Sequence, residues 1–246
     1  MANRYFDNSQ LSEAVRIASG QTKGVSHINK FGFNNTVPDD WELISVVSEN
    51  LVYATTASVA GAVSDDATDD LTGTGARTVK IQGVDANYDL LTETVDMDGT
   101  DSAVTTGEFL RIFRASVETA GTNGTAAGNI DITLGSDIQG RIDTDYDNQT
   151  LQCNYTVPAG KTAYIKRFQA TSTKDNKAAL VGIFTREPGG VFKVKQMIEM
   201  YRNAVTVDFP IPLEIPEKTD IEVRGKNLNS GQISIGASFD LILVDN

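Results

Sequence analysis

The sequence predicts an all-β protein whose antiparallel sheets pack as a β-sandwich, with a jelly-roll-like arrangement in its second half. Short runs of alternating apolar and polar residues recur from Trp41 to the end of the chain, as is typical of strands with one buried face. The 21 Gly and the many Thr, Asn and Asp suit numerous tight turns. No helical crossover separates the strand candidates, which favours antiparallel over parallel sheets.

The first 40 residues differ in character from the rest. Residues 7–17 are expected to form one short helix, with Asn8 or Ser9 as its cap. Residues 20–35 are polar, contain Gly and lack a clear period. We therefore expect residues 1–40 to form an extended N-terminal arm that lies on a neighbouring subunit, with a strand-and-loop edge of the same domain as the alternative.

Residues 41–145 are expected to form a first β module. Residues 43–52 are a strand candidate, and residues 58–74, rich in Ala, Gly and Asp, indicate a loop. Residues 79–97 predict a β-hairpin, because two alternating runs flank the turn residues 85–87.

Two further strands follow in this module. Residues 109–117 begin with apolar residues on both faces, which predicts a strand covered on both sides. Ile130, Ile132 and Leu134 alternate with polar residues and predict a strand with one buried face.

Residues 146–246 are expected to form the jelly-roll-like sandwich, either as a second module or as part of one continuous domain. Strand candidates alternate here with turns that contain Pro and Gly, and the prolines after residue 209 bar a central strand and point to an edge. Residues 233–243 show the cleanest alternation of the chain. The strand candidates of this part are residues 151–157, 162–170, 178–186, 191–201, 205–209, 221–223 and 233–243.

The net charge of −12 argues against two classes of partner. Nucleic acid requires clustered Lys and Arg to displace counterions, and anionic lipid headgroups repel an acidic surface. The chain begins without the apolar stretch of a signal peptide, and no run of about 20 apolar residues suggests a bilayer span. We expect a soluble protein held by neighbouring proteins, with no nucleic acid and no membrane.

Cys153 is the only cysteine, so an intrachain disulfide is impossible. It alternates with Leu151, Tyr155 and Val157, which predicts a buried thiol rather than a nucleophile. This cysteine usage fits a chain that folds in a reducing cytoplasm.

The sequence predicts neither a metal site nor catalysis. Three acidic groups lie at residues 65–70, 96–101 and 143–147, and none has the spacing of a calcium-binding EF-hand loop. His27 is the only histidine and has no second imidazole or thiolate with which to bind zinc. No nucleophile elbow or phosphate-binding loop is present. We expect no cofactor, no metal and no enzyme activity.

Several segments resemble a family of bacteriophage virion proteins, many from marine tailed phages. The segment GARTVKIQGVDANYDLLTETVDMDGT at residues 75–100 is similar to that family's GARTVxIxGLDxNYxxxxETV pattern. Residues 24–32, 109–115 and 148–164, the last with YTVPAGKTAY, resemble neighbouring segments of the same family. These segments extend from Gly24 to Phe168 and are strands and turns rather than active-site signatures.

The resemblance implies a structural role in the virion, after synthesis in the host cytoplasm. We expect a homo-oligomer, a trimer, that decorates or cements the head by burying surface at junctions with the major capsid protein or other virion proteins. A tail, neck or fibre protein that contacts the host surface, and a stand-alone carbohydrate-binding module, are the alternatives. The residues expected at the inter-subunit contact are His27, Lys30, Phe31, Phe33 and Trp41.

Overall fold

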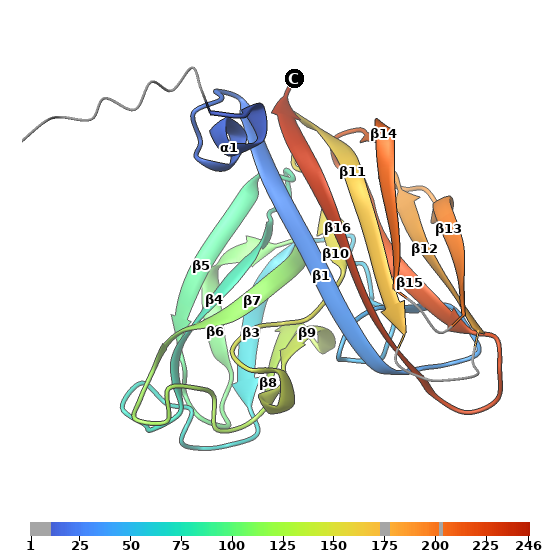
Figure 1. The fold of residues 1–246 in the computed structure, drawn as a ribbon. Helices are drawn as coiled ribbons and strands as arrows, with labels where there is room; N and C mark the ends of the chain where they lie inside the picture. The colour runs from blue at the N-terminus through green and yellow to red at the C-terminus, as the bar shows by residue number, and fades with distance from the viewer. Residues whose placement is uncertain (1–10, 173–177, 202–203) are drawn as a thin grey trace, which may run out of the picture.

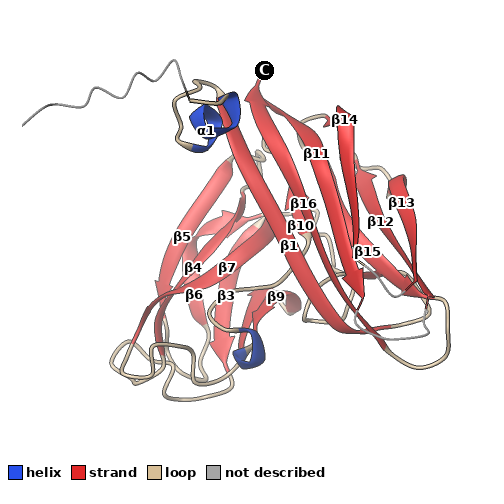
Figure 2. Ribbon diagram, viewed as in Figure 1, coloured by secondary structure: helices blue, strands red, loops and turns tan. Residues whose placement is uncertain are grey.

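The computed structural model describes residues 11–172, 178–201 and 204–246 and confirms an all-β sandwich protein. Its strands form four antiparallel sheets, which pack as two sandwiches side by side (Figures 1 and 2). We call them the N-terminal module and the C-terminal sandwich.

The C-terminal sandwich combines the first two described strands with the last seven. One sheet has the order β1-β16-β11-β14, and the facing sheet has the order β10-β15-β12-β13, with β2 beside β15. The strands of this sandwich are β1 (Val25–Val37), β2 (Glu42–Leu43), β10 (Asn154–Thr156), β11 (Lys161–Ser172), β12 (Ala178–Arg186), β13 (Lys193–Tyr201), β14 (Val205–Ile215), β15 (Asp220–Asn227) and β16 (Ile233–Asp245).

The N-terminal module contains the intervening strands. One sheet has the order β6-β3-β8-β9 and the other the order β5-β4-β7. The strands of this module are β3 (Ser58–Ser64), β4 (Ala76–Val84), β5 (Leu90–Asp96), β6 (Ala103–Phe109), β7 (Arg111–Ala120), β8 (Ile130–Leu134) and β9 (Asp137–Ile142). Two short helices complete the described structure, α1 (Glu13–Ala18) before β1 and the 3-10 helix η2 (Thr144–Tyr146) after β9.

Each sandwich has its own hydrophobic core. The larger core also includes residues from two strands of the other sandwich. The core of the C-terminal sandwich includes Val84 of β4 and Phe113 of β7, together with residues such as Phe168 and Phe239. The core of the N-terminal module lies between its own two sheets around Phe109. The two sandwiches therefore share buried surface where β4 and β7 meet the C-terminal sandwich.

Several expected strands are confirmed. The alternating run at residues 233–243 lies in β16, and every second residue from Ile233 to Leu243 is apolar and buried. Residues 79–97 lie in the antiparallel hairpin of β4 and β5. Residues 109–113 are all buried as expected, but the single strand expected at residues 109–117 is divided, because Phe109 ends β6 and Arg111 begins β7. The prolines lie in or beside β14, which is an edge strand as expected because Pro lacks the N–H that a central strand donates.

Residues 25–37 correct the expectation of an arm. They form β1, which pairs with β16 along its length, so the alternative of an edge strand in the same domain is correct for them. Gly32 explains part of this close packing, because a Cβ there would lie 2.2 Å from the Ile44 carbonyl oxygen and 2.6 Å from the Cys153 amide nitrogen. Residues 1–10, the remainder of the expected arm before α1, lie outside the described residues.

Three other boundaries differ from expectation. The helix expected at residues 7–17 is described from Glu13 to Ala18, with the Ser12 side chain as its cap, and residues 7–10 lie outside the described residues. The strand expected at residues 43–52 ends at Leu43, and the rest is a loop across the C-terminal sandwich. The loop expected at residues 58–74 begins with β3, whose small buried residues Ala60 and Ala62 lie in the module core.

Candidate interaction surfaces

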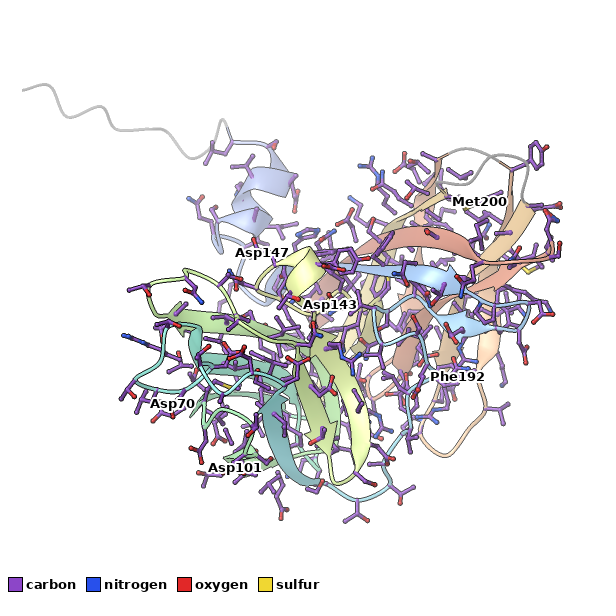
Figure 3. All side chains as sticks on the ribbon, turned by 90° about the horizontal axis from the view of Figure 1, so that it is seen from below. Asp70, Asp101, Asp143, Asp147, Phe192 and Met200 are labelled. Carbon is purple, nitrogen blue, oxygen red and sulfur yellow. The ribbon has the colours of Figure 1, made fainter. Side chains whose placement is uncertain are left out.

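The net negative charge of the chain lies in the N-terminal module. Residues 58–150 contain 17 Asp and Glu against 5 Lys and Arg, a net charge of −12. The rest of the chain contains 16 of each and is neutral. In Figure 3, Asp70 and Asp101 lie on loops of the module, and Asp143 and Asp147 flank its short helix. The molecule is therefore electrostatically polarised along the line between its two parts.

Asp69 has a structural role in these acidic loops. Its Oδ1 atom accepts hydrogen bonds from the backbone amides of Ala76 at 2.6 Å and Ala127 at 2.8 Å. Its Oδ2 atom accepts from the Ser64 hydroxyl at 2.6 Å and the Gly128 amide at 3.0 Å. Because four donors satisfy this fully buried carboxylate, it holds three loop segments together. No group of three His, Cys, Asp or Glu side chains suited to a metal ion occurs in the part of the chain that the structure describes.

The C-terminal sandwich has an open side formed by β13 and β14. In the described structure β13 pairs only with β12, and β14 only with β11, so each strand leaves one row of backbone donors and acceptors unpaired. Figure 1 shows both strands at the side of the sandwich away from the N-terminal module. Such edges are sites where another chain can add.

Exposed apolar side chains are frequent on these two edge strands. Among the described residues, twelve large apolar side chains are exposed, and five of them belong to β13, β14 or the turn before β13. Ile211, at 85 % exposure, is the most exposed of all twelve. The five are Val191, Val194, Met197, Tyr201 and Ile211. We call this set the open-edge patch.

The opposite side of the sandwich is fixed to the N-terminal module by a buried ion pair. The Arg111 Nε atom on β7 donates to the Asp220 Oδ1 atom on β15 at 3.0 Å, and both side chains are nearly inaccessible. Arg186 also donates to the Asp220 carboxylate at 2.6 Å, and the Thr156 hydroxyl donates to it at 2.8 Å. The Arg111 guanidinium further donates to the Ala54 carbonyl at 2.7 Å. This network joins strands of both sandwiches to the loop between β2 and β3.

Contacts between arginines and aromatic rings extend this network across the outer face of the sheet β10-β15-β12-β13. The Arg186 guanidinium lies 3.9 Å from the centre of the Tyr53 ring, and that of Arg224 lies 4.3 Å from the centre of the Phe192 ring. The Tyr53 hydroxyl donates to the Glu222 carboxylate at 2.5 Å. Burial raises the pKa of Glu222 above its usual range, although Arg224 opposes the shift. These contacts hold the loop before β3 against the sandwich.

The expected contact residues lie mostly in intramolecular contacts. His27 is exposed and lies 3.3 Å from the Asp240 carboxylate. Phe33 packs edge-on against Tyr146 at 5.2 Å between ring centres, and Trp41 packs edge-on against Phe184 at 5.0 Å. These three residues therefore lie at separate places rather than in one surface patch.

Lys30 and Phe31 lie together at the junction of the two sandwiches. Lys30 is buried and donates to the backbone carbonyl of Phe113. The Arg114 guanidinium lies 5.9 Å from the centre of the Phe31 ring. The role of these residues at a subunit contact stays a prediction, whereas their role between the sandwiches is visible in the structure.

Cys153 is buried, as expected from the alternation around it. Burial raises the pKa of its thiol far above the ordinary range, so the nucleophilic thiolate is suppressed at neutral pH. Among the described residues, no helix has both the length and the apolar character needed to cross a bilayer.

Sequence reasoning missed the open-edge patch and the Arg111–Asp220 pair. The only signal for the ion pair was a charged residue inside a stretch that is apolar on both faces, residues 109–113. Such a residue must find a partner when it is buried. The partner lies more than a hundred residues away, and the sequence does not identify it.

Comparison of the chain with protein-family models and with curated proteins finds no match. Among solved structures, that of the Gx strain of infectious bursal disease virus aligns over 90 % of this chain and 72 % of its own, with 10 % identity and a TM-score of 0.26. The VP2 subviral particle of the same virus aligns over 90 % and 72 %, with 9 % identity and a TM-score of 0.24. At these scores the likeness to virus structures carries no argument about function.

Proposed function

We propose that this chain is a structural protein of a bacteriophage virion that decorates and cements the head as a homotrimer bound to the major capsid protein. The resemblance of residues 75–100 and 148–164 to phage virion proteins supports the class of protein. The open-edge patch supports a role in assembly, and it is the observation that carries the proposal.

The division of charge supports one orientation on the particle. The neutral C-terminal sandwich carries the open-edge patch and docks on neighbouring subunits, because it brings no excess charge to be desolvated. The acidic module lies away from that contact and keeps the particle surface solvated. In this arrangement the inter-subunit contact is at β13 and β14 rather than at β1.

Burial of apolar area is the proposed mechanism of cementing. A specific interface buries about 800 Å² on each partner. Association also costs translational and side-chain freedom, so only the surplus appears as affinity. Each further 1.4 kcal/mol of surplus tightens retention about tenfold.

The first test is the copy number of this chain in purified particles, measured by quantitative mass spectrometry against the major capsid protein. A number comparable with that of the capsid protein supports decoration of the head. A number far below that of the capsid protein would indicate a location in the neck, tail or fibres instead. Absence from the particle refutes a virion role, and glycan binding then becomes the function to test.

A second test addresses the docking surface itself. Met197 and Leu71 are both 48 % exposed, the first on β13 and the second on a loop of the acidic module. We expect Met197→Glu to weaken trimer formation and retention on the head, because it places a charge in an apolar contact. Leu71→Glu is the matched control and should change neither. Light scattering after size-exclusion chromatography and rebinding to stripped particles measure both effects, and equal behaviour of the two variants would exclude the open-edge patch.

A further inference from the structure

A small cavity lies between the two sandwiches, apart from the open-edge patch. It has a volume of about 240 Å³ and is lined by β1, β4, β5, β7 and β10. Lys30, Phe113 and Tyr155 are its buried residues, whereas His27, Asn29 and Leu90 are exposed. The cavity therefore joins a buried floor to solvent.

The lining of this cavity contains bases but no acid. It includes Lys30, Arg114 and His27 together with the amide and hydroxyl groups of Gln82, Asn29 and Thr92. No Asp or Glu lines it, although the chain has 33 of them and the adjoining module carries the whole net negative charge. The charged side chains that line the cavity are thus all basic, whereas the adjoining module is acidic.

Lys30 is a buried amine without a carboxylate partner among the described residues. Lys30 is only 3 % exposed, and its side-chain amine donates a hydrogen bond to the Phe113 carbonyl. An ammonium group has three donors, so two are left for another acceptor. Burial, with repulsion from Arg114, lowers the pKa of Lys30 to about 7, and a nearby anion would oppose this shift.

Arg114 is the second unpaired base of the cavity. Its Nη2 atom donates to the Asn29 carbonyl at 2.9 Å, and no carboxylate of the described residues pairs with it. Five other arginines do pair with carboxylates in the described structure, namely Arg111, Arg141, Arg167, Arg186 and Arg224. Arg114, like Arg77, instead has a backbone carbonyl as its hydrogen-bond partner in the described structure.

The third polar group is the Tyr155 hydroxyl, from a residue that is 2 % exposed and lines the cavity. It has no hydrogen-bond partner in the described structure. A buried hydroxyl without a partner costs free energy, and an acceptor in the cavity would remove that cost.

We propose that this cavity is a binding site for a small oxyanion, a phosphate or a carboxylate, held by Lys30 and Arg114 with the Tyr155 hydroxyl as a further donor. Cations with free donors match the oxygens of such an anion. The volume suits a small anion or a single acidic group, because pockets for drug-sized ligands are about 300–1,000 Å³. The inference does not rest on the proposed virion role.

Isothermal titration calorimetry of the full chain with inorganic phosphate, and separately with acetate, tests this site at constant ionic strength, with chloride as the reference anion. We expect saturable binding of at least one of the two oxyanions. Phosphate binding alone would identify a phosphate site, and acetate binding alone would identify a site for a carboxylate. Absence of saturable binding to both overturns the proposal.

Three variants locate the binding. Arg114→Gln and Lys30→Met should each weaken the affinity at least tenfold. Arg167→Gln removes an exposed arginine on β11, outside this cavity, and should leave the affinity unchanged. Circular dichroism checks folding, and if Lys30→Met fails to fold, the partly exposed Arg114 decides the outcome. Equal affinities in the wild type and Arg114→Gln would also overturn the proposal.

Discussion

Removal of Arg111 is expected to destabilise the protein far more than removal of a surface base. Replacement of Arg111 by Met leaves the buried Asp220 carboxylate and the Ala54 carbonyl without one donor each. Loss of one partner from a buried ion pair typically costs about 3–5 kcal/mol. Arg186 still pairs with Asp220 at 2.6 Å, so we expect a value near the lower end, about 3 kcal/mol.

The expected loss is large enough to measure by thermal unfolding. For a chain of this size, about 1 kcal/mol shifts the melting temperature by about 2–4 °C, so Arg111→Met should lower it by about 6–12 °C. Lys80→Met is the control, because Lys80 pairs with Glu118 at the surface of the same sheet and should cost less than about 1 kcal/mol. Far-UV circular dichroism follows both. A decrease for Arg111→Met no larger than that for Lys80→Met would refute the role of the buried pair.

Three further predictions follow from close packing and burial. Gly32→Ala should lower the free energy of unfolding by at least about 1–3 kcal/mol in urea unfolding, because the added Cβ would clash with backbone atoms. Gly236→Ala is the control and should lower it less, because the nearest atom to its Cβ is the Thr171 hydroxyl oxygen at 3.0 Å. Between pH 7 and 10 the unfolded chain binds more protons at Lys30 than the folded protein does, because burial lowers the pKa of Lys30 to about 7. The free energy of unfolding should therefore rise with pH by up to about 1.4 kcal/mol per pH unit. Lys30→Met should remove that rise. Cys153 should react with a thiol reagent only after urea unfolding, and rapid reaction of the folded protein would contradict its burial.

Strands with one clean apolar face could be predicted from the sequence. β16 is the clearest case, because its inward residues are apolar without exception and its outward residues are mostly polar. The hairpin of β4 and β5 was predictable for a related reason, since its turn residues separate two alternating runs.

β1 could not be predicted because two of its buried positions are polar. Lys30 and Asn34 break the apolar alternation, yet each finds a partner at the edge of the sandwich. Lys30 donates to the Phe113 carbonyl, and the Asn34 amide donates to the Glu42 carboxylate at 2.7 Å. These partners come from other parts of the chain, so the local pattern alone left an arm and an edge strand of the same domain as alternatives.

The candidate sites depended on tertiary structure even more strongly. The five side chains of the open-edge patch are ordinary strand residues, and only the order of the strands shows that their edge is unpaired. The cavity at Lys30 likewise needs β1 to lie against β7 and β10. The sequence predicted the kind of fold and, from its prolines, the edge strand β14, but it did not identify β13 as the edge of the facing sheet.

The pairing of β1 with β16 constrains the time at which the chain can complete its fold. Val25 is opposite Val244, so the partner of β1 is synthesised after every other strand of the described structure. The N-terminal module has its own core and is synthesised before β10 to β16, which lets it form while translation continues. The larger sandwich must wait for β16, because β16 lies between β1 and β11. Until β16 is made, β1 and β11 lack the strand that lies between them, so the first sheet of this sandwich cannot close while its opposite end is already synthesised.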